Sequence, residues 1–236
     1  MIVLESVDST NSYLLNNKEL LDVPFFTVWA LGQTEGRGRE QRKWYSRKGS
    51  DLTFSVVFKT DIGNEAIPAT TLYTGLVLFE ILSKYTFGGL SLKWPNDICF
   101  GSKKLAGILC ETYQDEYKKA IVIGIGINIK RGEFADEIKD IAISLADICE
   151  YDADMDYMVY LVTSTLKRKL PGYTYPLSKE ICERWFRAAQ DNTEVIINVD
   201  GEELKANIEG LDPSGFLNVK DSKGILHQAY KGELRY

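Results

Sequence analysis

Gly32-Gln33-Thr34-Glu35-Gly36-Arg37-Gly38-Arg39-Glu40-Gln41-Arg42-Lys43-Trp44 is the stretch around which this chain is organised. It combines three glycines with four cationic side chains, and a single tryptophan ends it. Glycine lets a backbone approach a ligand closely, and arginine carries a planar set of donors that suits phosphate and carboxylate. Strand-like runs at 25–30 and 51–58 flank the stretch. We therefore expect a flexible cationic loop between two strands that closes over an anion.

A solvated surface hairpin and a nucleic-acid patch are the two other interpretations of this loop. A hairpin turn needs only one or two glycines. The chain has 28 Lys and Arg against 34 Asp and Glu, a net charge of −6, so a small anionic ligand suits it better than a polyanion. Common nucleotide motifs are absent, because Gln41 stands where a dinucleotide fingerprint needs glycine and no Gly-Lys pair exists for a P-loop.

The composition describes an ordinary globular protein. The chain has 236 residues, of which 44% are hydrophobic, enough for a core in one or two domains. It contains neither a long uncharged apolar stretch nor a signal pattern, so we expect a soluble, cytoplasmic protein without membrane contact. The four cysteines are widely spaced and His227 is the single histidine. This pattern favours reduced thiols over disulfides or a zinc site.

Periodicity predicts alternating strands and helices followed by a different C-terminal region. Strands are expected at 25–30, 51–58, 90–94, 103–111 and 120–129, with helices from 11 to 21, 65–85, from 142, 155–170 and 178–190. Trp185 and Phe186 are expected to anchor the last helix in the core. After Thr193, short runs separated by turn residues predict a small antiparallel barrel or sandwich. We place the domains at 1–190 and 191–236.

Polar residues at the ends of these elements are candidates for binding. Ser, Thr and Asn at 9–11 are ordinary helix caps, or they hold a polar ligand at a helix start. Pro95 should end a strand, and we expect Asn96-Asp97 to form a turn. Lys93 beside Asp97 is either a surface pair or a phosphate-binding cation next to a metal-binding carboxylate.

The strands expected at 103–111 and 120–129 carry a candidate lysine and several glycines. Strict alternation places Lys104 with Ala106 and Ile108, as a strand-end side chain that reaches solvent or as a functional ammonium. Gly107 indicates close approach by another group. Gly124 and Gly126 leave one strand face bare, and the buried polar residue that follows them, Asn128, needs hydrogen-bond partners.

Several stretches together resemble the biotin–protein ligase family. They are Asp8-Ser9-Thr10-Asn11, Gly36-Arg37-Gly38-Arg39 with Trp44, Lys93-Trp94-Pro95-Asn96-Asp97, Lys104-Leu105-Ala106-Gly107-Ile108-Leu109 and Gly124-Ile125-Gly126-Ile127-Asn128. They occur in the family's order and spacing, and the resemblance covers nearly the whole chain. It implies an α+β fold with a central mixed β-sheet and flanking helices, similar to class II aminoacyl-tRNA synthetases, and a small SH3-like C-terminal domain.

The resemblance implies a two-step ligation with biotin and ATP as substrates and Mg²⁺ as cofactor. Biotin's carboxylate attacks the α-phosphate of ATP and gives biotinyl-5′-AMP and pyrophosphate. A lysine of a biotin carboxyl carrier protein or domain then attacks this mixed anhydride. Cations between the carboxylate and the triphosphate would lower the barrier electrostatically.

Roles follow from the resemblance residue by residue. Its implied catalytic residues are Lys104, Arg39 and Arg37. Its implied biotin-binding residues are Ser9, Thr10, Asn11, Gln33, Arg37, Gly38, Arg39, Lys104 and Gly107. Its implied ATP- and adenylate-binding residues are Arg39, Trp44, Lys93, Asn96, Asn128 and Lys104, and Asp97 is the implied metal ligand.

The chain departs from the family pattern at three positions. Gln41 stands where many members have Gly, Arg47 where many have Pro, and Lys130 where a second Asn is common. The first motif begins at Asp8, so we expect no N-terminal helix-turn-helix and no repressor role. A lipoate–protein ligase or octanoyltransferase of the same fold, and a non-catalytic binding module, are the alternatives.

Overall fold

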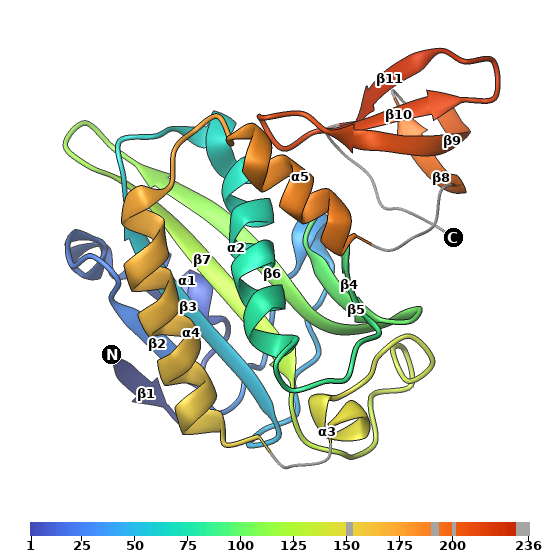
Figure 1. The fold of residues 1–236 in the computed structure, drawn as a ribbon. Coiled ribbons are helices and arrows are strands. Elements are labelled where there is room, and N and C mark those ends of the chain that lie inside the picture. The colour runs from blue at the N-terminus through green and yellow to red at the C-terminus, as the bar shows by residue number, and fades with distance from the viewer. Residues whose placement is uncertain (150–152, 190–193, 200–201, 230–236) are drawn as a thin grey trace.

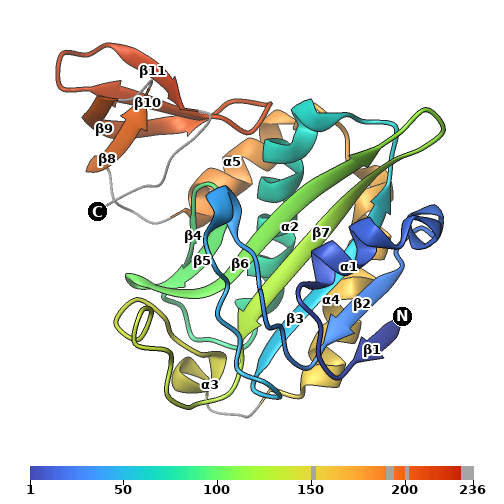
Figure 2. The same cartoon turned by 180° about the vertical axis from the view of Figure 1, so that it is seen from behind.

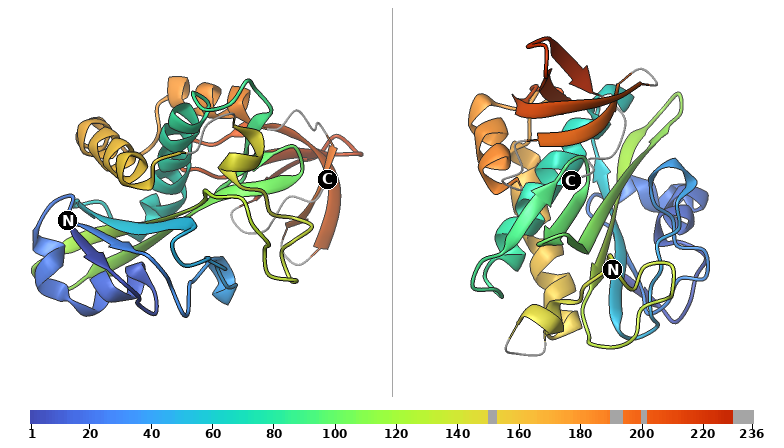
Figure 3. Two further views of the ribbon diagram at one scale, coloured as in Figure 1. Left: turned by 90° about the horizontal axis from the view of Figure 1, so that it is seen from below. Right: turned by 90° about the vertical axis from the view of Figure 1, so that its right-hand side faces the viewer.

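The computed structural model describes residues 1–149, 153–189, 194–199 and 202–229. These residues form an α+β fold with a seven-stranded mixed sheet and a separate four-stranded antiparallel sheet near the C-terminus (Figure 1). Helices flank the large sheet on both faces (Figures 2 and 3). The expected fold class, a central mixed sheet with flanking helices and a small all-β unit, is therefore confirmed.

The large sheet has the strand order β1-β2-β3-β7-β6-β5-β4. Its strands are β1 Ile2–Leu4, β2 Thr27–Ala30, β3 Asp51–Lys59, β4 Leu90–Lys93, β5 Asp97–Phe100, β6 Lys103–Gln114 and β7 Lys119–Asn128. Only the β1–β2 pair is parallel among these neighbours. β3 and β7 are buried along nearly their whole length, because both faces of the sheet are covered and their apolar runs suit that environment.

Three long helices cover one face of this sheet (Figure 3). They are α2 Ile67–Leu82, α4 Met155–Lys169 and α5 Lys179–Ala188. The larger apolar core lies between them and the sheet and includes Phe54, Leu72 and Trp185. The short helix α3 Leu145–Ile148 follows the loop after β7. By length and composition the helical segment 64–82 could cross a membrane, but 67% of it is buried inside the protein.

The opposite face carries α1 Thr10–Asn16 and a 3₁₀ turn, Lys18–Asp22. Leu14 and Leu21 from these elements pack on Val57 and Val122 of the sheet in a second, smaller core. The expected single helix from 11 to 21 is interrupted at Asn17, whose side-chain amide donates to the carbonyl of Tyr13 at 2.7 Å. A side chain that bonds to nearby backbone in this way competes with helix continuation.

The C-terminal sheet is antiparallel, with the order β11-β10-β9-β8. Its strands are β8 Glu194–Val199, β9 Glu202–Leu211, β10 Leu217–Asp221 and β11 Leu226–Ala229. The β9–β10 turn contacts the rest of the protein: Leu177 N–H donates to Pro213 O at 2.8 Å, and Trp94 Nε1 donates to Gly215 O at 3.2 Å. The expected domain boundary at Gln190 lies outside the described residues, so the two domain ranges stay a prediction.

Two further expectations were wrong in detail. Asp97 is not part of a turn but begins β5, which pairs with β4 and β6; the turn ends one residue earlier. Phe186 is 41% exposed, whereas Trp185 is 2% exposed. Successive residues of an amphipathic helix point about 100° apart, so only one of the two aromatic side chains can face the core.

Candidate active site

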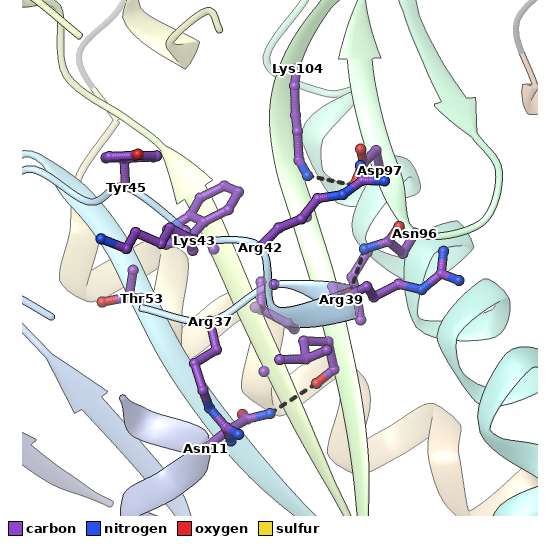
Figure 4. Close-up of a pocket in the computed structure, with 18 of the residues that line it drawn as sticks. Asn11, Arg37, Arg39, Arg42, Lys43, Tyr45, Thr53, Asn96, Asp97 and Lys104 are labelled. Atoms are coloured by element: carbon purple, nitrogen blue, oxygen red, sulfur yellow. Dashed lines mark hydrogen bonds and ion pairs between the residues drawn. The ribbon is translucent and has the colours of Figure 1, made fainter. Parts of the chain in front are cut away.

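A cavity of about 280 Å³ lies between the sheet face that carries α1 and the glycine-rich loop. The sequence-predicted residues that line it are Ser9, Thr10, Asn11, Gln33, Arg37, Gly38, Arg39, Trp44, Asn96, Asp97, Lys104, Gly107 and Asn128. Segments that are distant in the sequence thus meet at one place (Figure 4). Lys93 is the exception: it pairs with Asp97 at the end of β4 and does not line the cavity.

The floor of the cavity is a strip of glycines on β6 and β7. A Cβ atom at Gly126 would lie 2.8 Å from Trp44 Nε1, and one at Gly124 would lie 3.0 Å from Asn11 Cγ. Trp44 and Asn11 can therefore lie directly on the sheet only because these positions lack side chains. The bare strand face that the sequence predicted is confirmed, and these two residues occupy it.

Lys104 reaches the cavity from β6, but not on the face that strict alternation predicts. A Cβ at Gly107 would lie 3.0 Å from Lys104 Cε, so the lysine shares the face of Gly107. The pairing register between β5 and β6 shifts between Ile98 and Cys99, and such a bulge reverses the alternation of the strand that carries the extra residue. The expectation that Lys104 lies with Ala106 and Ile108 was therefore wrong.

The Lys104 ammonium lies at one end of the cavity beside a carboxylate. Its Nζ is 2.7 Å from Asp97 Oδ1, although the two groups are not aligned as a hydrogen bond, and 5.4 Å from the centre of the Trp44 ring. The side chain of Arg42 extends toward Asp97 (Figure 4), and Arg39 lines the same cavity. Positive charge thus gathers around Asp97.

Asn128 supports this end from beneath. It is 3% exposed, and its amide donates to Lys104 O at 3.3 Å and to Ile143 O at 3.1 Å. Lys104 N–H donates in turn to Ile141 O at 2.7 Å. The predicted need of Asn128 for partners is confirmed. Its amide ties β6 to the 138–143 segment, which brings Ile138 and Ile141 to the cavity wall.

The loop closes on itself above the floor. Gly38 N–H donates to Arg42 O at 2.7 Å, and Trp44 N–H donates to Gly36 O at 2.8 Å. Between them, Glu40 and Gln41 have φ values of 52° and 61°, a region that disfavours residues with a Cβ. Gln41 thus adopts a backbone conformation that suits the glycine common in the family.

Arg47 and Lys130, the other two positions at which the chain differs from the family pattern, are in contact at the edge of the loop. Arg47 Nη2 lies 2.6 Å from Asp51 Oδ1 and donates to Lys130 O at 2.7 Å. Its guanidinium also lies 4.4 Å from the Phe134 ring centre. Arg47 therefore links the exit of the cationic loop to the loop after β7.

At the other end of the cavity, Arg37 points toward Asn11 (Figure 4). Arg37 Nη2 lies 2.7 Å from Glu111 Oε2, and Asn11 Nδ2 donates to the same oxygen at 2.8 Å. Thr10 N–H donates to Gln33 Oε1 at 2.8 Å. Glu111 was not among the residues predicted from the sequence, although its spacing from Gly107 and Leu109 along β6 places the three on one face. Tyr45, Thr53 and the 138–142 segment also line the cavity without having been predicted.

The side chains around Asp97 show whether the expected Mg²⁺ ion could be bound there. Among the residues that the structure describes, no three His, Cys, Asp or Glu side chains gather as a metal-binding group. Mg²⁺ commonly takes only one or two protein carboxylates together with substrate phosphates. Asp97 faces the cavity, and its Oδ1 accepts no hydrogen bond in the described part of the chain, although it forms an ion pair with Lys104. A single carboxylate of this kind fits that role.

The cysteines are free thiols, as the sequence predicted. Burial raises the pKa of the Cys110 thiol, on β6 beside Glu111, to about 12. It therefore stays protonated at neutral pH and does not act as a nucleophile.

Comparison with known proteins agrees with this geometry. The model of the family described as "Biotin/lipoate A/B protein ligase family" matches residues 3–128, more than half of the chain. The chain belongs to the biotin/lipoate A/B protein ligase family. The matched range contains Gly107, Lys104 and the cationic loop, and it ends at Asn128.

Individual members of the family are similar to this chain over most of its length. "Bifunctional ligase/repressor BirA" of Bacillus subtilis is 37% identical over 72% of the chain, which spans only about half (53%) of that protein. "Biotin--[acetyl-CoA-carboxylase] ligase" of Paracoccus denitrificans is 26% identical over 94% of this chain and 95% of its own length. The structure "Biotin protein ligase from Aquifex aeolicus in complex with biotin and ATP" has a TM-score of 0.82 and 29% identity, and covers 99% of this chain and 97% of that one.

Proposed function

We propose that this chain is a biotin–protein ligase, which attaches biotin to a lysine of a biotin carboxyl carrier protein through biotinyl-5′-AMP. The observation that carries the proposal is that one and the same cavity has a polar end at Asn11 and a cationic end at Lys104. The likeness to a biotin- and ATP-bound ligase over 99% of the chain supports it, and so does the name of the Paracoccus relative.

Each end of the cavity suits one part of the reaction. Ser9, Thr10 and Gln33 line the polar end and would bind the head of biotin, which is neutral but rich in hydrogen-bonding groups. The biotin carboxylate would extend toward Lys104. Two anions, the carboxylate and the α-phosphate, must approach there, and fixed cations lower the repulsion between them.

The chemical steps conserve all groups. A carboxylate oxygen of biotin forms a bond to the α-phosphorus, and the bond to the β-phosphate oxygen breaks, so that pyrophosphate leaves. The neutral amine of the acceptor lysine then attacks the anhydride carbonyl carbon, loses a proton, and AMP leaves. Asp97 would hold Mg²⁺, which supplies charge neutralisation for the triphosphate.

The cationic loop would protect the intermediate between the two steps. The mixed anhydride is reactive toward water, and closing a site over it prevents hydrolysis. Arg39, which belongs to this loop and lines the cavity, would hold the adenylate. Trp44 would close the wall on the sheet side.

A single incubation tests the proposed activity. The purified chain is mixed with labelled biotin or labelled lipoate, ATP and Mg²⁺, with and without a biotin carboxyl carrier domain. We expect pyrophosphate release with biotin and transfer of label to the carrier lysine. Transfer of lipoate in place of biotin would favour the lipoate–protein ligase alternative. Binding of biotin without pyrophosphate release would favour a non-catalytic module.

The proposal includes no regulatory binding of operator DNA by this chain. Its net charge is −6, and sequence-specific DNA binding rests on cationic contacts to phosphates that are salt-dependent. In fluorescence anisotropy with biotin and ATP present, we expect no salt-sensitive, sequence-selective complex. A tight and selective complex would contradict this part of the proposal.

A further inference from the structure

Glu111 lies on β6 beside the polar end of the cavity and is absent from its lining. One carboxylate oxygen, Oε2, receives two donors from different parts of the chain. They are Arg37 Nη2 at 2.7 Å from the cationic loop and Asn11 Nδ2 at 2.8 Å from the start of α1. Neither contact belongs to the ladder of the sheet, so strand pairing does not require the carboxylate.

The Asn11 amide is held in one orientation by this carboxylate. Its Nδ2 donates to Glu111 and to Leu109 O at 3.1 Å, and its Oδ1 lies 2.6 Å from Ser55 Oγ. The amide lies over Gly124, where a Cβ would be 3.1 Å from Nδ2. Because an acceptor stands on one side and a hydroxyl on the other, the amide cannot rotate by 180° without losing bonds.

The network continues from Asn11 to the loop. Ser55 Oγ also lies 2.7 Å from Thr10 Oγ1, and Thr10 Oγ1 donates to Gln33 Oε1 at 3.2 Å. Gln33 and Arg37 both belong to the glycine-rich stretch. The loop is therefore tied to the sheet at two points, once through Thr10 and once through Glu111.

We propose that Glu111 is a positioning residue for biotin: it holds Arg37 and the Asn11 amide in the arrangement that receives the biotin head. The inference rests on the proposed function. Glu111 acts through these two residues and does not touch the reacting atoms. Its pairing with Arg37 also separates Arg37 from the cations near Asp97, so Arg37 serves the biotin end and not the phosphate end.

The proposal predicts a selective effect on biotin. Hydrogen bonds to charged groups are among the stronger ones. Glu111→Ala removes the acceptor and should raise the Kd for biotin roughly ten- to a hundredfold. Glu111→Gln keeps a carbonyl acceptor without the charge and should have a smaller effect. The KM for ATP should change less than about twofold, because the Lys104 end is untouched.

A double-mutant cycle makes the test sharper. Glu111→Ala, Arg37→Ala and the double variant are compared by titration calorimetry with biotin, by initial rates against ATP, and by thermal unfolding. We expect the double variant to bind biotin about as weakly as the single variant with the higher Kd. The reason is that both substitutions break the same contact, the one between Glu111 and Arg37. Asp22→Asn serves as the control, because it breaks an ion pair of similar length, 2.6 Å to Lys118, away from the cavity.

The outcomes are distinguishable. Unchanged or tighter biotin binding in Glu111→Ala, or additive effects in the cycle, would overturn the positioning role while wild-type ligation stands. An equal loss for biotin and ATP with a lowered Tm would show a structural role and would overturn it as well. A wild-type chain that binds no biotin would overturn the proposed function and this inference together.

Discussion

Lys104 is the residue on which the proposed chemistry most depends. Its ammonium projects over Gly107 toward Asp97, whereas Lys103 is exposed. Lys104→Ala should lower adenylate formation at least about a hundredfold, as expected for loss of one preorganised charge donor. Pyrophosphate release measured with biotin and ATP checks this. Near-normal release in Lys104→Ala, with loss in Lys103→Ala, would show that the wrong lysine has been assigned.

Gly126 provides a second test at the residue scale. A Cβ there would lie 2.8 Å from Trp44 Nε1, so Gly126→Ala must displace the indole from the cavity floor. We expect a loss of roughly two- to tenfold in kcat/KM, the equivalent of an aromatic contact, with little change in Tm. Gly172→Ala is the matched control, because its Cβ would meet nothing within 4 Å. Equal kinetics for both variants would contradict the role given to the glycine strip.

At the scale of elements, one carboxylate joins the three long helices. Glu80 on α2 lies 2.7 Å from Lys169 Nζ on α4 and pairs with Arg184 on α5. Burial raises the pKa of Glu80, but the hydrogen bonds and charges of Lys169 and Arg184 outweigh it, so the pKa lies below its usual value. The charged carboxylate is thus favoured by the folded state.

This depressed pKa predicts how stability depends on pH. A group whose folded pKa lies below the unfolded value, about 4.3 for Glu, stabilises the folded state above that value and loses the contribution as pH falls through the folded pKa. Glu80→Gln should therefore lower Tm at pH 7, and the difference from wild type should shrink below about pH 4. Thermal unfolding across this range measures it.

Glu180→Gln is the control for that series. Glu180 is 77% exposed in its pair with Arg184, and exposed pairs contribute about 0–1 kcal/mol. Its substitution should leave Tm almost unchanged at every pH. A Glu80→Gln difference that stays constant from pH 7 to the acid range would mean that the helix junction does not depend on the Glu80 charge.

At the scale of the whole molecule, the C-terminal sheet is joined to the large one through a turn. Gly215 has φ 93°, and a Cβ there would lie 2.6 Å from Ala69 N at the start of α2. Its carbonyl accepts from Trp94 Nε1 at 3.2 Å. Since Trp94 precedes Pro95 and Asn96 in the cavity lining, the C-terminal sheet supports the cationic end of the site from behind.

Trp94→Phe should weaken this junction. It removes the donor to Gly215 and should cost about 1 kcal/mol more than the loss of ring volume alone, or roughly 2–4 °C in Tm. Trp29→Phe is the matched control: Trp29 is 4% exposed, and its Nε1 has no hydrogen-bond partner in the part of the chain that the structure describes. Equal Tm losses in the two variants would show that the Trp94 bond contributes nothing.

Local sequence determined much of this protein. Alternation and apolar runs placed most strands of the large sheet, helical spacing placed α2, α4 and α5, and turn residues marked the C-terminal sheet. The cationic loop, the glycine strip and all but one of the predicted site residues meet in the cavity. These features depend on the preferences of neighbouring residues, which a sequence shows directly.

Tertiary structure decided the rest. Strand alternation predicted the wrong face for Lys104, because the shifted β5–β6 register arises only when the strands pair. Lys93 carries the right chemistry but ends outside the cavity. Glu111 meets Asn11 across 100 residues of chain, and no local pattern encodes such a contact. Residue types and periodicity thus establish which groups are available, and long-range pairing of strands decides which of them meet.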